Sequence, residues 1–315
     1  MIDLLENPAW VDSRLVTNSK IEHLPNSLFD EIKNGLNKFN SSNPLVSVTI
    51  PAYNEEYGIL RTLQSLSRNQ TSYEVEIIVI NNNSTDRTQE VLDRLNVKSF
   101  FQPVPGWGPA RQLGLEKALG KYVLMADSDC FYPPEWIQEM TTSLSKENVT
   151  CVYGGYSYLG TREEARWKFL IYELLRNLIL EIRQMKHPYL NARGLNMGIV
   201  RALALKKGFI YLKMKGEDGR MCFDLMQYGK IVRLRSKKNL VWTLRRTSRD
   251  GGIMNTFIKN VLIEFSKFKT YFRKPRIHDT HTSANVTRSE FKYSRQPEES
   301  QLEKKTGVGE NIDGR

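Results

Sequence analysis

A polar triplet, Asp127-Ser128-Asp129, directly follows the apolar run 122–126 and carries two carboxylates one residue apart. At the end of a strand, two such side chains can face a common point, and hard oxygen ligands of this kind suit Mg²⁺ or Mn²⁺. Alone, the triplet is better explained as a solubilising or capping turn. Its position after a strand favours a divalent metal site at the end of that strand.

Residues 51–55 (Pro-Ala-Tyr-Asn-Glu) follow a second apolar run, 45–50. The ring of Tyr53 at a strand end offers a flat face on which a nucleobase can stack. The alternative is structural, with Pro51 ending the strand while Asn54 and Glu55 begin the next helix. This stretch alone does not separate the two interpretations.

Residues 81–86 (Asn-Asn-Asn-Ser-Thr-Asp) follow a third apolar run, 75–80. Their amide and carboxylate groups can hydrogen-bond a base or a ribose. An Asx-rich turn that caps the following helix explains the same residues, and for this stretch alone it is the stronger explanation.

The elements that must position these residues alternate along the chain. Because ligands of parallel sheets bind outside the carboxyl ends of the strands, the three polar stretches are expected to converge on one site. The alternation predicts an α/β fold with a mostly parallel central sheet and helices on both faces. Strands are predicted at 45–50, 75–80, 98–102 and 122–126, and helices at 59–66, 88–95 and 110–119.

The second half of the chain is less regular. Gly216-Glu217-Asp218 precedes an apolar helical stripe, and acids are favoured at a helix N-terminus by the backbone dipole. For this triplet alone, such a capping role is the simplest interpretation. Further helices are predicted at 136–144 and 163–183, and short strands at 151–154, 231–234 and 240–244.

Five stretches in this order and spacing resemble the nucleotide-sugar-binding half of the family 2 glycosyltransferases. The resemblance implies a Rossmann-like GT-A fold, a nucleotide diphosphate sugar as donor, and Mn²⁺ or Mg²⁺ on the diphosphate. It runs from about residue 46 to residue 242 and rests on Pro-Ala-Tyr-Asn-Glu, Asn-Asn-Asn-Ser-Thr-Asp-Arg-Thr, Gly-x-Gly-x-Ala-Arg-x-x-Gly-Leu (106–115), Asp-Ser-Asp and Gly-Glu-Asp.

The resemblance also implies residue roles. Asp127 would lie against the nucleotide and Asp129 would hold the metal. Asp218 would remove the proton of the acceptor hydroxyl as general base, with Glu217 orienting it. Attack from the face opposite the leaving group implies inversion of the anomeric centre. The residues expected to bind substrate are Pro51, Ala52, Tyr53, Glu55, Asn81, Asn82, Arg111, Asp127, Ser128 and Asn196, and Asp127 is expected to share the metal with Asp129.

Two of these assignments have alternatives. Asn196 lies in 191–198, which resembles the segment that closes on donor and acceptor, while a plain loop is the competing interpretation. Arg245 and Arg246 could clamp a phosphate, or form an exposed basic turn.

One departure concerns Asn81 and Asn82, which stand where the family usually has an acidic pair. An amide donates as well as accepts, so the identity of the nucleobase is left open. The departure also motivates an alternative function, a non-catalytic nucleotide-sugar-binding or scaffold protein with the same fold. The presence of Asp127, Asp129 and Asp218 argues against it.

Charge is unevenly distributed along the chain. The net charge is +11, and residues 161–276 hold 27 Lys or Arg against 9 Asp or Glu, while residues 1–160 are mildly acidic. Residues 255–276 predict a basic amphipathic helix, which suits an anionic membrane surface or, equally, packing on the domain. No nucleic-acid partner is expected because no recognition motif accompanies the charge.

The expected organisation is a helical extension (1–43), a GT-A domain (44–250), a basic helix (251–275) and a disordered tail (276–315). Within the domain, 45–145 form the nucleotide-sugar half and 146–250 the acceptor half. No secretory signal or transmembrane run is predicted, which favours the cytoplasm, with peripheral attachment to the inner face of the membrane as an addition. The expected reaction moves a sugar to a hydroxyl of a saccharide or lipid-linked acceptor, as in polysaccharide biosynthesis.

Overall fold

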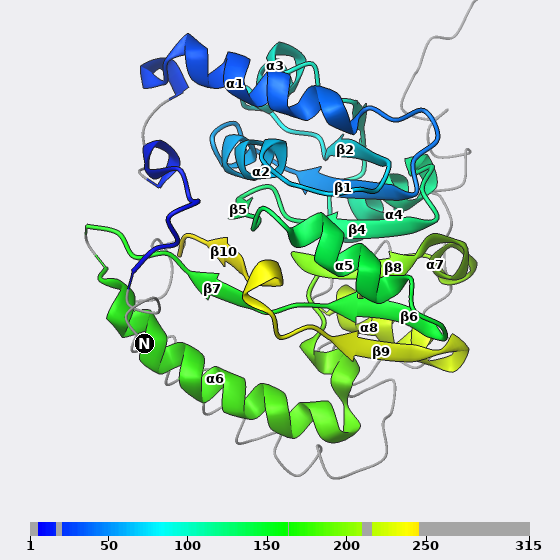
Figure 1. The fold of residues 1–315 in the computed structure, drawn as a ribbon. Coiled ribbons are helices and arrows are strands. Elements are labelled where there is room, and N and C mark those ends of the chain that lie inside the picture. Colours follow the sequence, from blue (N-terminus) through cyan, green and yellow to red (C-terminus); the bar gives the residue numbers. More distant parts are fainter. Residues whose placement is uncertain (1–5, 17–20, 163, 210–215, 246–315) are drawn as a thin grey trace, which may run out of the picture.

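The computed structural model describes residues 6–16, 21–162, 164–209 and 216–245, and a seven-stranded sheet runs through its centre (Figure 1). Strands β1 to β4 are mutually parallel where they pair, and β6 and β9 are also parallel. Within this sheet only β8 runs antiparallel to its neighbours, β4 and β6. In spatial order the strands are β3 (Ser99–Phe101), β2 (Val75–Asn81), β1 (Val46–Ala52), β4 (Tyr122–Ala126), β8 (Asn196–Val200), β6 (Val149–Tyr153) and β9 (Lys230–Arg233).

A second, three-stranded sheet lies beside the main one (Figure 1). Its strands are β5 (Cys130–Phe131), β10 (Val241–Thr243) and β7 (Tyr156–Tyr158), in that order. β10 pairs antiparallel with β5 and parallel with β7. Because β5 begins just after the Asp-x-Asp triplet, this sheet ties residues late in the chain to the end of β4.

Helices cover both faces of the main sheet, and alternate strand residues point to opposite sides. Val48 and Leu124 face the core shared with α1, α2, α3 and α5, whereas Val123 and Met125 face the core shared with α7 and α8. This alternation is the period of two expected of a strand buried on both faces. The helices are α1 (Asn26–Leu36), α2 (Gly58–Ser67), α3 (Thr88–Arg94), α4 (Trp107–Lys117), α5 (Trp136–Leu144), α6 (Arg166–Lys186), α7 (Arg201–Lys207) and α8 (Glu217–Leu225).

The predicted α/β architecture is confirmed, but three strands were missed: β8 in the main sheet, and β5 and β7 in the smaller one. The plain loop considered for residues 191–198 is wrong in its second half, because β8 begins at Asn196 and lies between β4 and β6. Gly198 fits there because a Cβ on it would come within 2.8 Å of a Leu124 methyl and 2.9 Å of a Val152 methyl. A glycine in a short segment obscured the apolar alternation of this central strand.

Helix α1 of the N-terminal stretch packs on α2 and buries Leu28, Phe29 and Ile32 in the same core as the sheet. The predicted basic helix (251–275) and the tail (276–315) lie outside the described residues. Among the described residues, no helix is both long and apolar enough to cross a membrane. The cysteines are buried and free, and the sulfur atoms of Cys151 and Cys222 lie 3.6 Å apart.

Candidate active site

The first two polar loops are joined by hydrogen bonds at the carboxyl edge of the sheet. Ala52 of β1 pairs with Asn81 of β2, so both chains leave the sheet at the same level. Beyond this point the Asn54 amide N–H donates to Ser84 Oγ at 3.0 Å, and the Thr85 N–H donates to Asn54 Oδ1 at 2.8 Å. The predicted convergence of these two loops is therefore present.

Asn81 and Asn82 use their amides differently. Asn81 is buried and fully engaged, since its Nδ2 donates to Gln89 Oε1 at 2.8 Å and its Oδ1 accepts from the Ser84 N–H at 3.0 Å. The Nδ2 of Asn82 donates to the Gly106 carbonyl at 2.8 Å, while its Oδ1 has no hydrogen-bond partner within the described structure. Asn81 therefore holds the loop, and Asn82 retains one acceptor.

Tyr53 and Glu55 present two different groups at the end of β1. The Tyr53 ring is 56% exposed, although Ala52 before it is buried and Pro51 is half-buried. Glu55 folds back over the start of α2, where a Cβ on Gly58 would lie 2.1 Å from its Oε2 and 3.2 Å from the Ser128 carbonyl oxygen. The glycine at the first position of α2 therefore makes room for this carboxylate beside the third loop.

The third loop places both of its carboxylates at the same edge. Asp127 and Asp129 are half-buried and Ser128 between them is buried. Backbone contacts fix the turn, because the Asp127 N–H donates to the Tyr132 hydroxyl at 2.8 Å and Thr62 Oγ1 donates to the Asp127 carbonyl at 2.9 Å. The loop is thus rigid, while its acidic side chains remain accessible.

Arg111 of α4 lies among three carboxylates that come from distant parts of the chain. Its Nη2 is 3.3 Å from Asp127 Oδ1, its Nη1 is 3.3 Å from Glu217 Oε1, and the same Nη1 forms an ion pair with Asp218. The side chain is 8% exposed, so these charges interact with little screening by solvent. The site therefore combines residues of α4 and of the turn after β4 with the first turn of α8.

A glycine opposite Arg111 makes this arrangement possible. A Cβ on Gly194 would lie 2.1 Å from Arg111 Cζ, and the Gly194 N–H donates to Asp218 Oδ2 at 2.8 Å. The turn 193–195 therefore holds one oxygen of Asp218 while Arg111 pairs with the other. Tyr132 anchors the same turn, because its hydroxyl donates to the Leu195 carbonyl at 2.9 Å.

Glu217 and Asp218 open α8 after Gly216, whose φ of 99° lies in the left-handed region where glycine is favoured. Burial raises the pKa of Glu217, and the nearby Arg111 opposes that increase. Asp218 is more exposed than Glu217, with 20% of its side chain accessible against 7%. Of the two acids, Asp218 is therefore the better placed to meet a substrate.

Asn196 does not present its amide to the site. Its Oδ1 accepts from Trp136 Nε1 at 2.8 Å, and its Nδ2 donates to the Gly155 and Asn239 carbonyls at 2.8 and 2.7 Å. The side chain is 1% exposed. Substrate binding by Asn196 therefore has no support in its contacts, which instead fix the start of β8 behind the turn 193–195.

Arg245 has a structural partner, since its Nη1 lies 2.6 Å from Glu164 Oε1. A phosphate clamp at Arg245 therefore competes with an existing ion pair, and Arg246 lies outside the described residues. Gly194 and Tyr132 were missed from the sequence, because a lone glycine and an aromatic after a weak strand carry no signal of their own. Only the fold places them beside Asp218 and Asp127.

The carboxylates of Asp127 and Asp129 fit a divalent cation in kind. Both are hard oxygen donors on one turn at the sheet edge, the donor type that Mg²⁺ and Mn²⁺ prefer. In the described part of the chain no cluster of three or more His, Cys, Asp or Glu side chains is arranged to hold a metal. Two protein carboxylates leave other coordination positions to water and a substrate phosphate.

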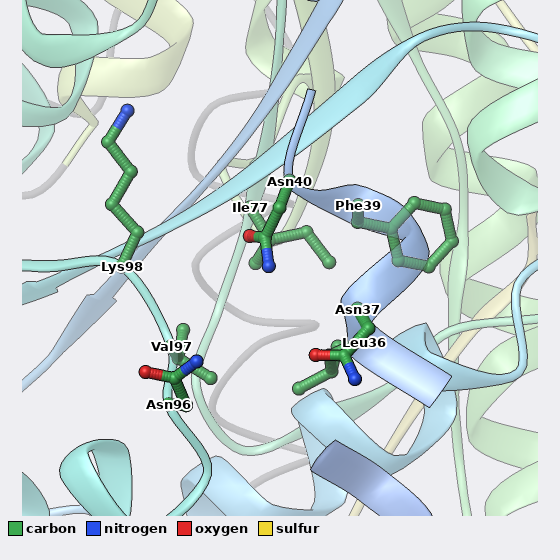
Figure 2. Close-up of a pocket in the computed structure, with 8 residues that line it drawn as sticks. All are labelled: Leu36, Asn37, Phe39, Asn40, Ile77, Asn96, Val97 and Lys98. Carbon is green, nitrogen blue, oxygen red and sulfur yellow. The ribbon is translucent and has the colours of Figure 1, made fainter. Parts of the chain in front are cut away.

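One small pocket lies elsewhere, beside the amino ends of β2 and β3 (Figure 2). Its lining joins the end of α1 to the segment before β3 and includes only one charged side chain. It is remote from the carboxyl edge, where the acidic residues converge. The lining residues are Leu36, Asn37, Phe39, Asn40, Ile77, Asn96, Val97 and Lys98.

Comparisons with known proteins agree with this geometry. The family model for glycosyl transferase family 2 matches residues 47–204. An uncharacterized glycosyltransferase of Haemophilus influenzae is 33% identical over 125 residues, which cover 36% of this chain and 48% of that protein. The chondroitin synthase of Escherichia coli is 30% identical over 143 residues, which cover 44% of this chain and 21% of that protein. These matches span about half or less of the relatives' lengths.

A solved structure shows the same fold. The mannosyltransferase PcManGT from Pyrobaculum calidifontis, in complex with GDP-Man and Mn²⁺, superimposes with a TM-score of 0.50 at 17% identity. The alignment covers 80% of this chain and 73% of that one. The central sheet and its helices thus form an architecture that is already known from a nucleotide-sugar enzyme.

Proposed function

This chain belongs to glycosyl transferase family 2, and from that premise we propose that it transfers a sugar, with inversion, from a nucleotide diphosphate sugar to a hydroxyl of a saccharide or lipid-linked acceptor. The observation that carries the proposal is the meeting of Asp127, Glu217 and Asp218 around Arg111. Residues from both halves of the domain thus share one electrostatic centre, as a two-substrate transfer requires.

We assign the donor nucleotide to the edge formed by β1, β2 and β4. The exposed ring of Tyr53 offers a stacking face for the base. Asn82 Oδ1 is buried without a partner in the described structure, and a small movement of its loop would make it an acceptor for a base N–H. An amide oxygen at this point can accept a hydrogen bond, as the carboxylate of an acidic residue would, but it carries no negative charge. Asn82 is therefore compatible with nucleotide binding despite the departure from the family pattern.

Asp127 and Asp129 would hold the divalent metal on the diphosphate. When bound, such an ion neutralises charge that develops on the leaving nucleotide. The protein's own contribution is the turn itself, whose backbone is held at Asp127 by hydrogen bonds with Tyr132 and Thr62. Arg111 pairs with Asp127 in this structure and thereby limits the repulsion among the acids of the site.

Asp218 is our candidate for the general base. Its Oδ2 is held by the Gly194 N–H, so the carboxylate has a fixed orientation from which it can accept the proton of an acceptor hydroxyl. Attack by that hydroxyl opposite the leaving group gives inversion. Glu217 is buried beside it and serves to position Arg111 rather than to contact substrate.

A thermal-shift panel of UDP-, GDP- and dTDP-sugars with and without Mn²⁺ tests the donor site. We expect one donor to raise the melting temperature only with metal, and Asp129→Ala to remove that increment. Exposed Asp93→Ala on α3 is the control. NMR of the product made from the stabilising donor then reports the anomeric configuration.

The outcomes separate the candidate functions. A donor that binds but is never transferred to any saccharide or lipid-linked acceptor would favour the non-catalytic alternative. A product with retained configuration would remove Asp218 as the base for a single displacement. No stabilisation by any nucleotide sugar would overturn the donor site.

A further inference from the structure

Helix α6 (Arg166–Lys186) has its apolar side facing outward. Of the ten large hydrophobic side chains that are exposed in the described structure, five belong to this helix, which runs along the outside of the molecule apart from the main sheet (Figure 1). A helix that only covers a domain places its apolar face inward. The five exposed side chains are Trp167, Leu174, Leu175, Leu178 and Met185.

Four of these residues form one straight stripe. At 3.6 residues per turn, Trp167, Leu174, Leu178 and Met185 fall within about 40° of one another around the axis, over about 27 Å of helix. Their exposures are 53%, 61%, 61% and 71%. The stripe is therefore continuous and accessible, unlike hydrophobic residues scattered singly over a surface.

The inward face of α6 is held by polar contacts in addition to apolar packing of Phe169 and Ile182. Glu173 accepts hydrogen bonds from Ser157 Oγ at 2.8 Å and the Tyr158 N–H at 2.9 Å, and it pairs with Arg166 at 2.7 Å. Arg176 Nη2 donates to the Tyr156 carbonyl at 2.6 Å. The helix is thus fixed to β7 by these polar contacts and by the buried ring of Phe169, which packs on Tyr158. The exposed side chains of the stripe are left for another partner.

The charges around the stripe are mainly basic. Helix α6 contains five Lys or Arg and two acidic residues, and of the five cations Arg166 and Arg183 are buried, Arg176 is half-buried, and Lys168 and Lys186 are exposed. One of the acids, Glu173, is buried, and the other, Glu181, pairs with Arg233 and Arg235 at 2.8 Å each. Lys168 and Lys186 are exposed near the two ends of the stripe. Apolar side chains flanked by cations complement a surface of acyl chains beneath anionic headgroups.

We propose that the outward stripe of α6 docks this protein on an anionic lipid surface, with Trp167, Leu174 and Leu178 entering the interface. The helix lies on the bilayer in this arrangement and does not cross it, in keeping with its five basic residues. The proposal does not depend on sugar transfer, because vesicle binding requires neither donor nor acceptor.

Residues 255–276 of the same chain are a less favourable occupant of the stripe. Their sequence carries six Lys or Arg against one Glu, and α6 is itself basic, so packing one on the other brings like charges together. A common anionic surface attracts both. The same charge disfavours a second copy of α6 as the partner.

Sedimentation of the full chain with vesicles tests the proposal at low salt. We expect binding to phosphatidylcholine vesicles that contain about one third phosphatidylglycerol and little binding to phosphatidylcholine alone. Trp167→Gln, Leu174→Gln and Leu178→Gln combined should lower the partition coefficient about tenfold. The matched control replaces exposed apolar residues elsewhere, in Phe101→Gln, Leu119→Gln and Tyr228→Gln.

A second variant probes charge without touching the apolar side chains. Lys168→Glu with Lys186→Glu should also reduce binding about tenfold, whereas Lys33→Glu with Lys146→Glu, which are exposed on other elements, should not. A wild-type chain that stays in the supernatant, or a stripe variant that binds as well as wild type, overturns the proposal.

Two further outcomes identify another occupant and likewise overturn the proposal. If the stripe variant melts at a lower temperature than its control without lipid, the stripe packs within the chain. If wild type is a dimer that the variant dissociates, the stripe is a subunit interface.

Discussion

The guanidinium of Arg111 forms an ion pair with the carboxylate of Asp218, which joins helix α4 of the nucleotide half to the first turn of α8. A charge-assisted contact of this kind favours the ionised carboxylate, which is the form that a general base requires. In the proposed reaction the pair would loosen at Asp218 when an acceptor hydroxyl arrives. Arg111 would thus prepare the proposed base and also compete with the acceptor for it.

Replacing Asp218 by Asn should lower kcat by about a thousandfold, since an amide cannot take the proton of the acceptor hydroxyl. Nucleotide affinity should remain near that of wild type, because donor binding is assigned to the opposite side of Arg111. Turnover and nucleotide titration of the same preparation check both parts. Asp30→Asn, on the exposed side of α1, is the control, and an active Asp218→Asn enzyme would falsify the assignment of the base.

Replacing Arg111 by Met should destabilise the fold by about 3 kcal/mol, because three carboxylates lose their shared cation in a largely buried site. The loss should be smaller at pH 5 than at pH 7, because burial raises the pKa of Glu217 and this acid is less fully charged at the lower pH. Urea unfolding at the two pH values measures it. Arg111→Lys keeps the charge without the planar guanidinium, so its stability should lie between those of wild type and Arg111→Met. Equal stability of all three proteins would contradict this account.

The stability effect of Glu217 should depend on pH with a definite sign. Burial raises its pKa in the folded state, so the folded protein binds this proton more tightly than the unfolded chain. Its favourable contribution is complete below the unfolded value of about 4.5 and is lost as pH rises through the raised folded value. Between pH 4 and pH 7, Glu217→Gln should therefore become progressively more stable relative to wild type. Unfolding free energies of both proteins across that range measure this change. If Glu217→Gln instead lost stability relative to wild type as the pH rises, the pKa of Glu217 would be lowered by folding.

Replacing Asn81 and Asn82 in turn should affect different properties, mainly stability for Asn81 and mainly nucleotide affinity for Asn82. Asn82→Ala should weaken nucleotide binding about tenfold, because the acceptor proposed for the base is removed. Asn81→Ala should lower thermal stability more than affinity, since both ends of its amide are bonded to Gln89 and Ser84. Calorimetric titration with nucleotide and a thermal melt of each variant compare them. A larger affinity loss in Asn81→Ala than in Asn82→Ala would reverse our assignment.

A methyl group at Gly194 should disrupt the site through Arg111. Gly194→Ala places a Cβ 2.1 Å from Arg111 Cζ, so the guanidinium must move and the ion pair with Asp218 is strained. We expect a loss of about 2 kcal/mol in unfolding free energy and a larger loss in kcat than in nucleotide affinity. Gly155→Ala is the matched control, because its Cβ meets only a Leu240 methyl at an ordinary 3.4 Å. Similar behaviour of the two variants would refute the steric argument.

Sequence reasoning was most successful where the chain alternates regularly. The strand expected at 122–126 and the helix expected at 136–144 match β4 and α5, because both are strongly periodic and clearly bounded. It failed for β8, whose five residues include Gly198, and for β5 and β7, which have only two and three residues. Short strands of this kind have too little local pattern to be recognised.

In the candidate site, too, residues in recognisable motifs could be predicted, whereas roles that depend on tertiary contacts could not. Asp127 and Asp218 could be named from motifs, since each follows or precedes a recognisable element. That Asn81 is used inside the protein while Asn82 keeps an acceptor could not be predicted, because it depends on Gln89 and Gly106 meeting the two amides in space. The outward orientation of α6 was also hidden, because helical periodicity shows that a face is apolar but not which way it points.

The reversed direction of β8 has a consequence for how the protein folds. Because this strand enters the sheet from the carboxyl edge, the turn that holds Asp218 is delivered by insertion of β8 between β4 and β6. Such pairing between distant segments is slow relative to local helix formation. We therefore expect the nucleotide half to acquire structure first during synthesis, and catalytic competence to appear last, when the inserted strand closes the sheet.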